Sequence, residues 1–277
     1  MTALHVPASP FGPITLDETD LSALEQFTGM EAESCVRRFA ETELADMARQ
    51  WHDAAPRTPE EIRGFYERTS EYVWELLAWN LSGAYAPYVA LIDRVCDAAP
   101  QRPRRTVLDH GAGVGSAALA FARRGFDVTI ADVPGHTLDF AKLRLQHHDV
   151  DVEDVEVVDE VPDFGAALYD AVVSFDVLEH VTRPLDVASA LRRALRPDGV
   201  AAIVAHFDHR PDTHPHHLPE HVARFAGHRW EMHMRATGWI PRGGDLYRPA
   251  TRARRNVERL RYALWRATGL HVEHRPS

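Results

Sequence analysis

The chain has 277 residues, 45% of them hydrophobic and 26% charged, which is an ordinary composition for one large globular domain with a smaller appendage. Its 41 acidic and 31 basic residues give a formal net charge of -10, which repels phosphate backbones and argues against a nucleic-acid partner. No apolar run approaches the length of a membrane-spanning helix, so we expect no membrane partner.

The cysteines and the N-terminal sequence bear on the cellular compartment. Cys35 and Cys96 give neither a Cys-x-x-Cys spacing nor a disulfide framework, which fits a reducing environment. The first residues show no basic segment followed by an apolar core, so we expect no signal peptide. Together these features predict a cytoplasmic protein.

The first of three regions, residues 1–104, is predicted to be a helical cap or lid. Apolar residues recur at helical spacing over 21–39, 61–80 and 85–98. The prolines that begin at Pro100 break the last helix and mark a boundary.

The second region, residues 105–208, alternates strands with helices. The segments that read as strands are 106–109, 127–131, 155–158, 170–175 and 199–205. The segments that read as helices are 116–124, 137–148 and 184–195. Apolar strands separated by helices predict an α/β fold, with a Rossmann-like, mostly parallel sheet and helices on both faces.

The third region, residues 209–277, begins with a loop rich in histidine and proline. A helix is expected over about 220–237, a strand could open at 238–240, and an amphipathic helix is expected over 252–268. We expect these elements to complete the core.

A glycine-rich loop joins the first strand of the second region to its helix. It contains Gly111, Ala112, Gly113 and Gly115, and glycines allow a sharp turn and a close approach of a nucleotide-like ligand. Asp109 stands immediately before it, at the end of the strand. A carboxylate there suits a ligand that carries an ammonium group and would repel a pyrophosphate.

Acidic residues follow the next two strands. Asp132, followed by Val133, ends the second strand, where a carboxylate can accept both hydroxyls of a ribose. The alternative for Asp132 is a helix cap or a solvated loop residue. Asp159 follows the third strand and could accept from an adenine amino group, although an exposed loop acid is nearly as good an explanation.

These motifs resemble those of the class I S-adenosylmethionine-dependent methyltransferases. Asp109-x-Gly111-x-Gly113-x-Gly115 resembles their first motif, and Asp132 their acidic residue after the second strand. Leu195-Arg196-Pro197-Asp198-Gly199-Val200 resembles their turn before the fifth strand, with Asp198 in place of a glycine. The resemblance implies S-adenosylmethionine as cofactor and in-line displacement at its sulfonium methyl, where catalysis comes mainly from positioning.

The segment Ser174 to Val181 resembles the ubiquinone-pathway O-methyltransferases and their small-molecule relatives. The resemblance implies that Phe175 and Asp176 line the cofactor pocket. Some of those enzymes hold a divalent cation at this segment, and the matching positions are Asp176, Glu179 and His180. The favoured alternative is that Glu179 and His180 hold the loop together and that no metal is bound.

Three residues are candidates for catalysis. His206 follows the fifth strand, where this fold faces the transferred methyl, and its unperturbed pKa near neutrality suits a general base. His180 and Tyr66 are further candidates. In this family the helical region that carries Tyr66, Tyr72 and Trp79 usually covers the cofactor, and aromatic faces can stabilise a sulfonium. Core packing is the alternative for these aromatics, as is a structural role for His206.

The histidine-rich loop is a second place where a metal could bind. His214, His216 and His217 lie among carboxylates at a density that could hold Zn, Fe or Ni, and prolines stiffen the loop. No His-Glu-x-x-His signature is present. The alternative is a surface or lid loop in which one or two histidines contact the substrate.

The resulting expectation is a methyltransferase acting on an O, N or C nucleophile of a small molecule, of the secondary-metabolite type, as a monomer or homodimer. Two alternatives remain open. The cofactor could cyclise or be cleaved with release of methylthioadenosine, or the chain could be a non-catalytic binding module.

Overall fold

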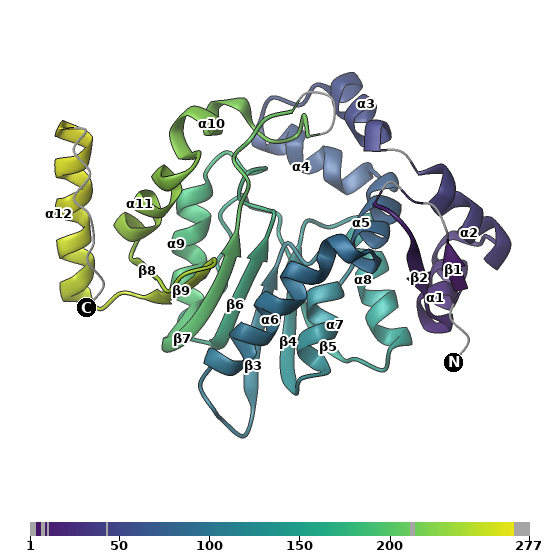
Figure 1. Cartoon of the computed structure of the whole chain (residues 1–277), viewed down its shortest axis with the longest axis horizontal. Helices are drawn as coiled ribbons and strands as arrows, with labels where there is room; N and C mark the ends of the chain where they lie inside the picture. Colours follow the sequence, from purple (N-terminus) through teal and green to yellow (C-terminus); the bar gives the residue numbers. More distant parts are fainter. Residues whose placement is uncertain (1–3, 7–8, 10, 43, 211–213, 269–277) are drawn as a thin grey trace.

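A computed structural model describes residues 4–6, 9, 11–42, 44–210 and 214–268 of the chain. Figure 1 shows a central twisted sheet with helices on both faces, and helices of the N-terminal region beside and above it. The α/β, Rossmann-like fold expected from the sequence is confirmed.

In the described part of the chain, the central sheet has seven strands in the order β5-β4-β3-β6-β7-β9-β8. Strands β5 to β7 run parallel, and β9 and β8 add an antiparallel edge. The strands are β3 (Arg105–His110), β4 (Phe126–Asp132), β5 (Val152–Glu156), β6 (Tyr169–Phe175), β7 (Leu195–Val204), β8 (Trp239–Pro241) and β9 (Leu246–Pro249).

Alternate residues of the strands face two helical layers. Val107 packs with apolar side chains of α6 (Ala86–Ala98), α7 (Ser116–Ala122) and α8 (His136–His147) on one face. Its neighbour Leu108 packs on the other face. The helices of that face are α9 (Pro184–Ala194), α10 (Pro219–Phe225) and α11 (His228–Thr237). Both faces of these strands are therefore buried, as their nearly continuous apolar sequences require.

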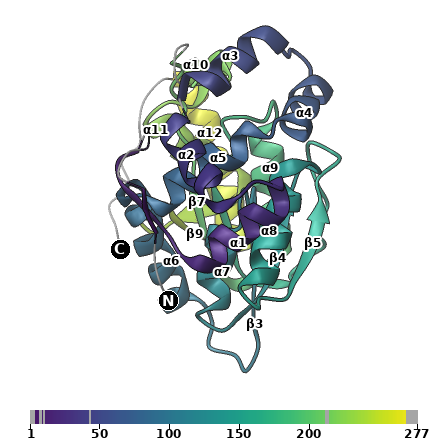
Figure 2. The ribbon, with the colours of Figure 1, turned by 90° about the vertical axis from the view of Figure 1, so that its right-hand side faces the viewer.

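The N-terminal region forms a cap whose apolar core is shared with the sheet domain, because Val114 of the glycine loop and Phe140 of α8 belong to the same cluster. Two short antiparallel strands and helices α1 and α2 lie at one side, while α3 and α4 lie above the sheet (Figures 1 and 2). The elements are β1 (Leu4–Val6), β2 (Ile14–Leu16), α1 (Glu18–Thr28), α2 (Ala32–Glu41), α3 (Leu44–Ala54), α4 (Pro59–Arg68), α5 (Glu71–Leu81) and the short 3-10 helix η1 (Gly83–Tyr85).

A buried ion pair fastens this cap to the sheet domain. The Arg144 guanidinium on α8 donates to both carboxylate oxygens of Asp20 on α1, at 2.7 and 3.1 Å. His148 contacts the same carboxylate at 2.8 Å, and Arg144 also donates to the Val114 carbonyl and the Ser116 hydroxyl. One guanidinium thus connects the cap to the end of the glycine loop.

The structure divides three segments of continuous helical spacing, and in the first, residues 21–39, Gly29 at φ +69° separates α1 from α2. The expected helix over 61–80 ends at Thr69, whose extended backbone separates α4 from α5. The expected helix over 220–237 ends at Ala226, and Gly227 at φ +64° precedes α11. Apolar periodicity continues across these breaks, so the pattern alone did not locate them.

Five strands differ from the expectation, among them β7, which was expected at 199–205 and begins at Leu195. The strand placed at 155–158 is Val152–Glu156, because these residues pair with Val128 to Asp132 of β4. Strands β1, β2 and β9 were not predicted, since each has only three or four residues. Helix α12 (Arg252–Thr268) spans the expected residues and lies against α11 at the edge of the molecule, in yellow in Figure 1.

The division of the chain at residues 104 and 208 stays a prediction. Helix α6 precedes the first boundary and packs directly on the sheet. Within the described residues, no helix combines the length and the apolar character needed to cross a bilayer.

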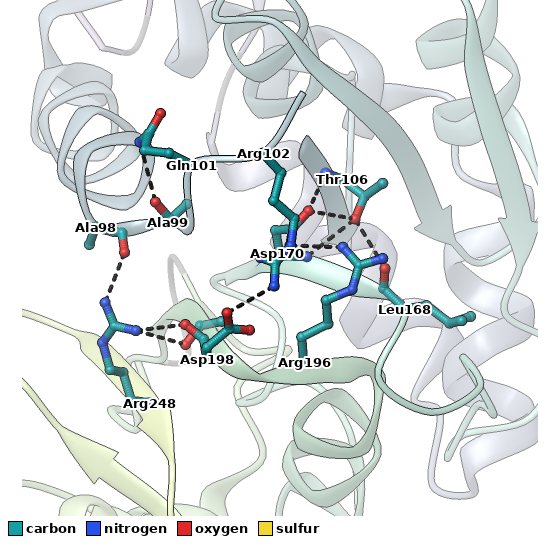
Figure 3. A network of polar contacts seen from close by, with 11 residues as sticks. Ala98, Ala99, Gln101, Arg102, Thr106, Leu168, Asp170, Arg196, Asp198 and Arg248 are labelled. Carbon is teal, nitrogen blue, oxygen red and sulfur yellow. Dashed lines mark hydrogen bonds and ion pairs between the residues drawn. The ribbon is translucent and has the colours of Figure 1, made fainter. Parts of the chain in front are cut away.

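The amino-terminal edge of the sheet is held by a network around Asp170 (Figure 3). Its fully buried carboxylate pairs with Arg102 at 2.6 Å and Arg196 at 2.8 Å, and accepts from the Thr106 backbone amide at 3.0 Å. Burial alone would raise the pKa of Asp170, but the hydrogen bonds and positive charges of these partners lower it. The network joins the start of β6 to the first residues of β3 and β7 and to the segment that precedes β3.

Asp170→Ala is expected to lower the free energy of unfolding by about 3 kcal/mol, because it leaves two guanidinium groups and a backbone amide without their buried acceptor. Urea denaturation monitored by circular dichroism measures the change. The matched control is Asp198→Ala, which removes an exposed partner of Arg102 and should cost less than about 1 kcal/mol. Equal losses in the two variants would contradict the assignment of the network to Asp170.

Candidate functional site

A cavity of about 600 Å³ lies at the carboxyl ends of the parallel strands. Its floor is the glycine loop with the residues that follow β4 and β6, and helices α4 and α5 of the cap form its roof. The histidine-rich loop closes one side, where Leu218 packs against Trp51 and Phe65 of the cap. The cap therefore covers the site, as expected for a lid.

The glycine loop is held in a conformation that requires glycine. Gly111, Gly113 and Gly115 all have positive φ, between +54° and +79°. A Cβ on Gly111 would lie 2.1 Å from the Val177 side chain, so this glycine is required by the neighbouring loop as well as by its backbone angle. The Gly111 amide donates to the Ala131 carbonyl at 2.7 Å, which ties the loop to the end of β4.

Asp109 lies below this loop with an unsatisfied carboxylate. It is 2% exposed, and its Oδ2 has no hydrogen-bond partner among the described residues. Burial and the neighbouring Asp132 carboxylate raise the pKa of Asp109 to about 7. A buried carboxylate oxygen without a partner is costly, so the site calls for a cationic ligand group at this point.

Asp132 connects the end of β4 to the glycine loop. Its Oδ2 accepts from the Gly113 amide at 2.7 Å and its Oδ1 from the Val133 amide at 2.8 Å. Burial raises its pKa to about 6 despite these two hydrogen bonds. Each carboxylate oxygen has a second lone pair, so the side chain can also accept from ligand hydroxyls.

The remaining residues predicted to bind the cofactor also line the cavity: Ala112, Val133, Asp159, Phe175 and Asp176. Asp159 is exposed at the rim, and Phe175 packs edge-on against Tyr88 with ring centroids 5.4 Å apart. Their individual contacts with a ligand stay predictions.

Two further buried carboxyl groups add to the acidic lining of the cavity. Glu179 Oε2 and Glu75 Oε2 have no hydrogen-bond partners among the described residues. Burial raises the pKa of Glu75 to about 7, while burial and the Asp176 charge raise that of Glu179. Glu75 was missed by the sequence reasoning, although one acid within the apolar segment from Tyr72 to Trp79 was a usable signal.

His206 and Asp176 form a pair at the end of the cavity. His206 Nδ1 lies 2.9 Å from Asp176 Oδ1, while Tyr88 donates to Asp176 Oδ2 at 2.5 Å. The hydrogen bond to Asp176 raises the pKa of His206 to about 9. The unperturbed value near neutrality that suggested His206 from the sequence does not include this contact, because no sequence signal brought Asp176 to the imidazole. Tyr88, also missed, lies on α6 and gave no signal beyond its aromatic neighbours.

Aromatic side chains of the cap form much of the cavity wall. Tyr66, Tyr72 and Trp79 all line it. The Tyr66 hydroxyl is buried without a hydrogen-bond partner among the described residues, and burial raises the pKa of Tyr66 far above its usual range. A phenol held neutral in this way can donate a hydrogen bond to a ligand but is unsuited to act as a base.

Among the described residues, possible metal ligands form three groups, of which two lie in the cavity, and neither of these two matches a predicted set. Asp176 and Glu179 group with His206, whereas His180 groups with His216 and His217. The set Asp176, Glu179 and His180 is therefore divided, because the His180 ring turns toward the histidine-rich loop. The centroid of that ring lies 4.8 Å from the centroid of the His216 ring and 4.9 Å from that of the His217 ring.

Comparison with known proteins agrees with this geometry. A family profile described as a methyltransferase domain matches residues 83–251, more than half of the chain. The chain belongs to the class I S-adenosylmethionine-dependent methyltransferase family.

Individual relatives match over shorter stretches. The ubiquinone biosynthesis O-methyltransferase of Pectobacterium atrosepticum is 33% identical over 126 residues, which cover 44% of this chain and 52% of that protein. The enzyme of the same name from Alkalilimnicola ehrlichii is 35% identical over 96 residues, covering 34% and 39%. The chain thus spans about half the length, or less, of these curated relatives.

A solved structure of Haemonchus contortus phosphoethanolamine N-methyltransferase 2 in complex with S-adenosyl-L-methionine is also similar in fold. It is 22% identical with a TM-score of 0.47, and the match covers 65% of this chain and 44% of that one.

S-adenosylmethionine is the cofactor of this family, and the cavity fits it on two counts. The unpartnered Asp109 oxygen is a suitable acceptor for its ammonium group, and the concentration of buried carboxylates favours a ligand that carries positive charge. Asp132, beside the glycine loop, is in position to accept from ribose hydroxyls.

Asp132→Ala is expected to weaken S-adenosylmethionine binding by about tenfold or more, through loss of the ribose acceptor and of the contact with the Gly113 amide. Isothermal titration calorimetry measures the change. The matched control is Asp127→Ala at the opposite end of β4, an exposed carboxylate that should leave affinity unchanged. Unchanged affinity in Asp132→Ala would remove the ribose assignment.

Binding of S-adenosylmethionine is expected to weaken as the pH falls below 7, because the ammonium group must compete with the proton that Asp109 takes up at its pKa of about 7. The limiting slope is about tenfold per pH unit for one proton. Titrations between pH 5.5 and about 8 measure it. Asp109→Asn should bind weakly and lose most of this slope; a full slope in the variant would assign the proton to another group.

Proposed function

We propose that the chain transfers the methyl group of S-adenosylmethionine to a small-molecule nucleophile. The observation that carries the proposal is one cavity that holds both the unpartnered Oδ2 of Asp109 and the His206–Asp176 pair. The first supplies an anchor for the cofactor, and the second supplies a proton acceptor for the attacking atom.

The chain's own contribution is mainly positioning. Asp109 holds the ammonium group, Asp132 holds the ribose, and the cap excludes water from the cavity. When bound, S-adenosylmethionine supplies an electrophilic methyl on a sulfonium. The aromatic wall of Tyr72, Trp79 and Tyr88 favours such a cation and also suits a flat acceptor.

His206 acts as the general base in this proposal. Asp176 accepts a hydrogen bond from the Nδ1–H group of His206 and so orients the ring. The Nε2 atom is then left to take the proton of the acceptor. Because the pKa of His206 is raised to about 9, the imidazole is mostly protonated at pH 7 and only a small fraction is competent as a base. The rate should therefore rise with pH toward 9.

The acceptor that best suits this site is a weakly acidic hydroxyl on an aromatic ring. An enclosed aromatic wall favours a planar molecule, and a histidine base is matched to a hydroxyl that ionises near neutral or mildly alkaline pH. The relatives named as ubiquinone biosynthesis O-methyltransferases support oxygen as the attacked atom. The proposal includes a role in secondary metabolism, which would supply the acceptor.

The reaction is tested with methyl-labelled S-adenosylmethionine and a panel of phenols, catechols and amines, including secondary-metabolite scaffolds. Mass spectrometry should find labelled methyl on an acceptor and one S-adenosylhomocysteine for each methyl transferred. Release of methylthioadenosine would instead show cyclisation or cleavage of the cofactor. Binding of the cofactor without either product would favour a non-catalytic module.

The assignment of the base is tested by its pH dependence. With an active acceptor, kcat should rise through a pKa near 9 in the wild type, and Asp176→Asn should move that pKa toward the ordinary histidine value of 6.5. The C2 proton of the His206 ring, assigned by its loss in His206→Gln, should titrate in parallel by NMR. A kcat profile that does not follow the NMR titration would exclude His206 as the base.

A further inference from the structure

We propose that His180, His216 and His217 form a binding site for a divalent metal ion of the zinc class on the acceptor side of the cavity. One ligand atom from each of the three imidazoles lies within 4.8 Å of the others. All three side chains are buried, and all three line the cavity. The histidines come from two loops, the one after β6 and the histidine-rich loop, so the fold brings them together over a separation of 36 residues.

The hydrogen bonds of two imidazoles leave the correct nitrogen for a metal. His180 Nδ1 lies 3.3 Å from the His216 carbonyl, and His217 Nδ1 lies 2.7 Å from the Asp208 carbonyl. A carbonyl oxygen can only accept, so each Nδ1 carries the proton and each Nε2 presents a lone pair. Zinc-binding histidines are typically oriented in this way, with the second ring nitrogen bound to a carbonyl or carboxylate.

The third imidazole, that of His216, has a buried nitrogen, Nδ1, without a hydrogen-bond partner among the described residues. The centroid of the His216 ring lies 5.3 Å from that of the His217 ring and 6.1 Å from that of the Trp51 ring. A buried nitrogen of this kind calls for a partner, and a metal ion between the three rings would supply it.

The site has room and charge for the ion. Tetrahedral zinc with bonds of 2.0–2.1 Å places its ligand nitrogens about 3.3 Å apart, so small rotations of the rings from their present spacing are sufficient. Asp208, which lies 3.2 Å from His217 Nδ1, and the carboxylates of Asp176 and Glu179 in the same cavity offset the added positive charge.

The proposed role of the ion follows from the number of protein ligands. Three histidines leave a fourth position that faces the cavity, which is the arrangement of catalytic rather than structural zinc sites. There the ion would bind an acceptor hydroxyl and lower its pKa, and His206 would take the released proton. This role rests on the proposed methyl transfer, whereas the metal binding does not.

Metal binding is tested first on the full chain without an affinity tag. Elemental analysis after dialysis against excess Zn²⁺ and removal of free metal should find about one ion per chain, and Co²⁺ should give the intense visible absorption of a tetrahedral site. His216→Gln and His180→Gln should each lower Zn²⁺ affinity by at least about tenfold. The matched control is His221→Gln, a buried histidine of the same region outside the trio, which should retain the ion.

The outcomes separate the metal site from the reaction. Failure of the wild type to retain Zn²⁺, or a weak octahedral Co²⁺ spectrum, would overturn the site even if the variants do not fold. Equal retention by His216→Gln and the wild type would also overturn it. Zn²⁺ binding without methyl transfer to any acceptor would keep the site and reject the proposed function. Methyl transfer unaffected by chelation would keep the function and reject the role of the ion.

Discussion

The burial of negative charge at the carboxyl edge of the sheet is the constraint on which the site depends. Asp109 and Asp132 end neighbouring strands, and the parallel order of β3 and β4 brings their carboxylates to the same place. Glu179 and Glu75 add buried acids from the next loop and from the cap. Such groups are stable in the absence of a ligand only by taking up protons, so the pKa values of all four are raised.

The same constraint explains how the two ends of the cavity differ. At Asp109, whose Oδ2 has no hydrogen-bond partner among the described residues, the cavity is suited to a cation that arrives with the ligand. Where Asp176 already has His206 and Tyr88 as partners, its charge is used within the protein to strengthen a base. The cap covers both ends of the cavity, with Leu76 and Trp79 in its lining, and the less polar surroundings strengthen both effects.

Much of this could be predicted from the sequence because it depends on local pattern. The strands around the glycine loop, the loop itself and Asp132 are adjacent in sequence and were placed within one or two residues. The grouping of the histidines could not be predicted, because His180 and His216 meet only through the packing of two loops on the cap. The raised pKa of His206 likewise depends on Asp176, 30 residues away on a neighbouring strand. The break between α4 and α5 and the short strand β9 depend on tertiary contacts that periodicity does not record.

The clamp between Asp20 and Arg144 has a consequence for where this protein can be divided. Sequence similarity sets the start of the family domain at residue 83, beyond helices α1 to α5 of the cap. A fragment cut there would retain Arg144 but lose Asp20, leaving a guanidinium beside the Val114 carbonyl and the Ser116 hydroxyl without its counter-ion. The glycine loop would then rest on an unneutralised charge. The stretch that resembles the family is therefore shorter than the part of the chain that supports the glycine loop, which includes α1 of the cap.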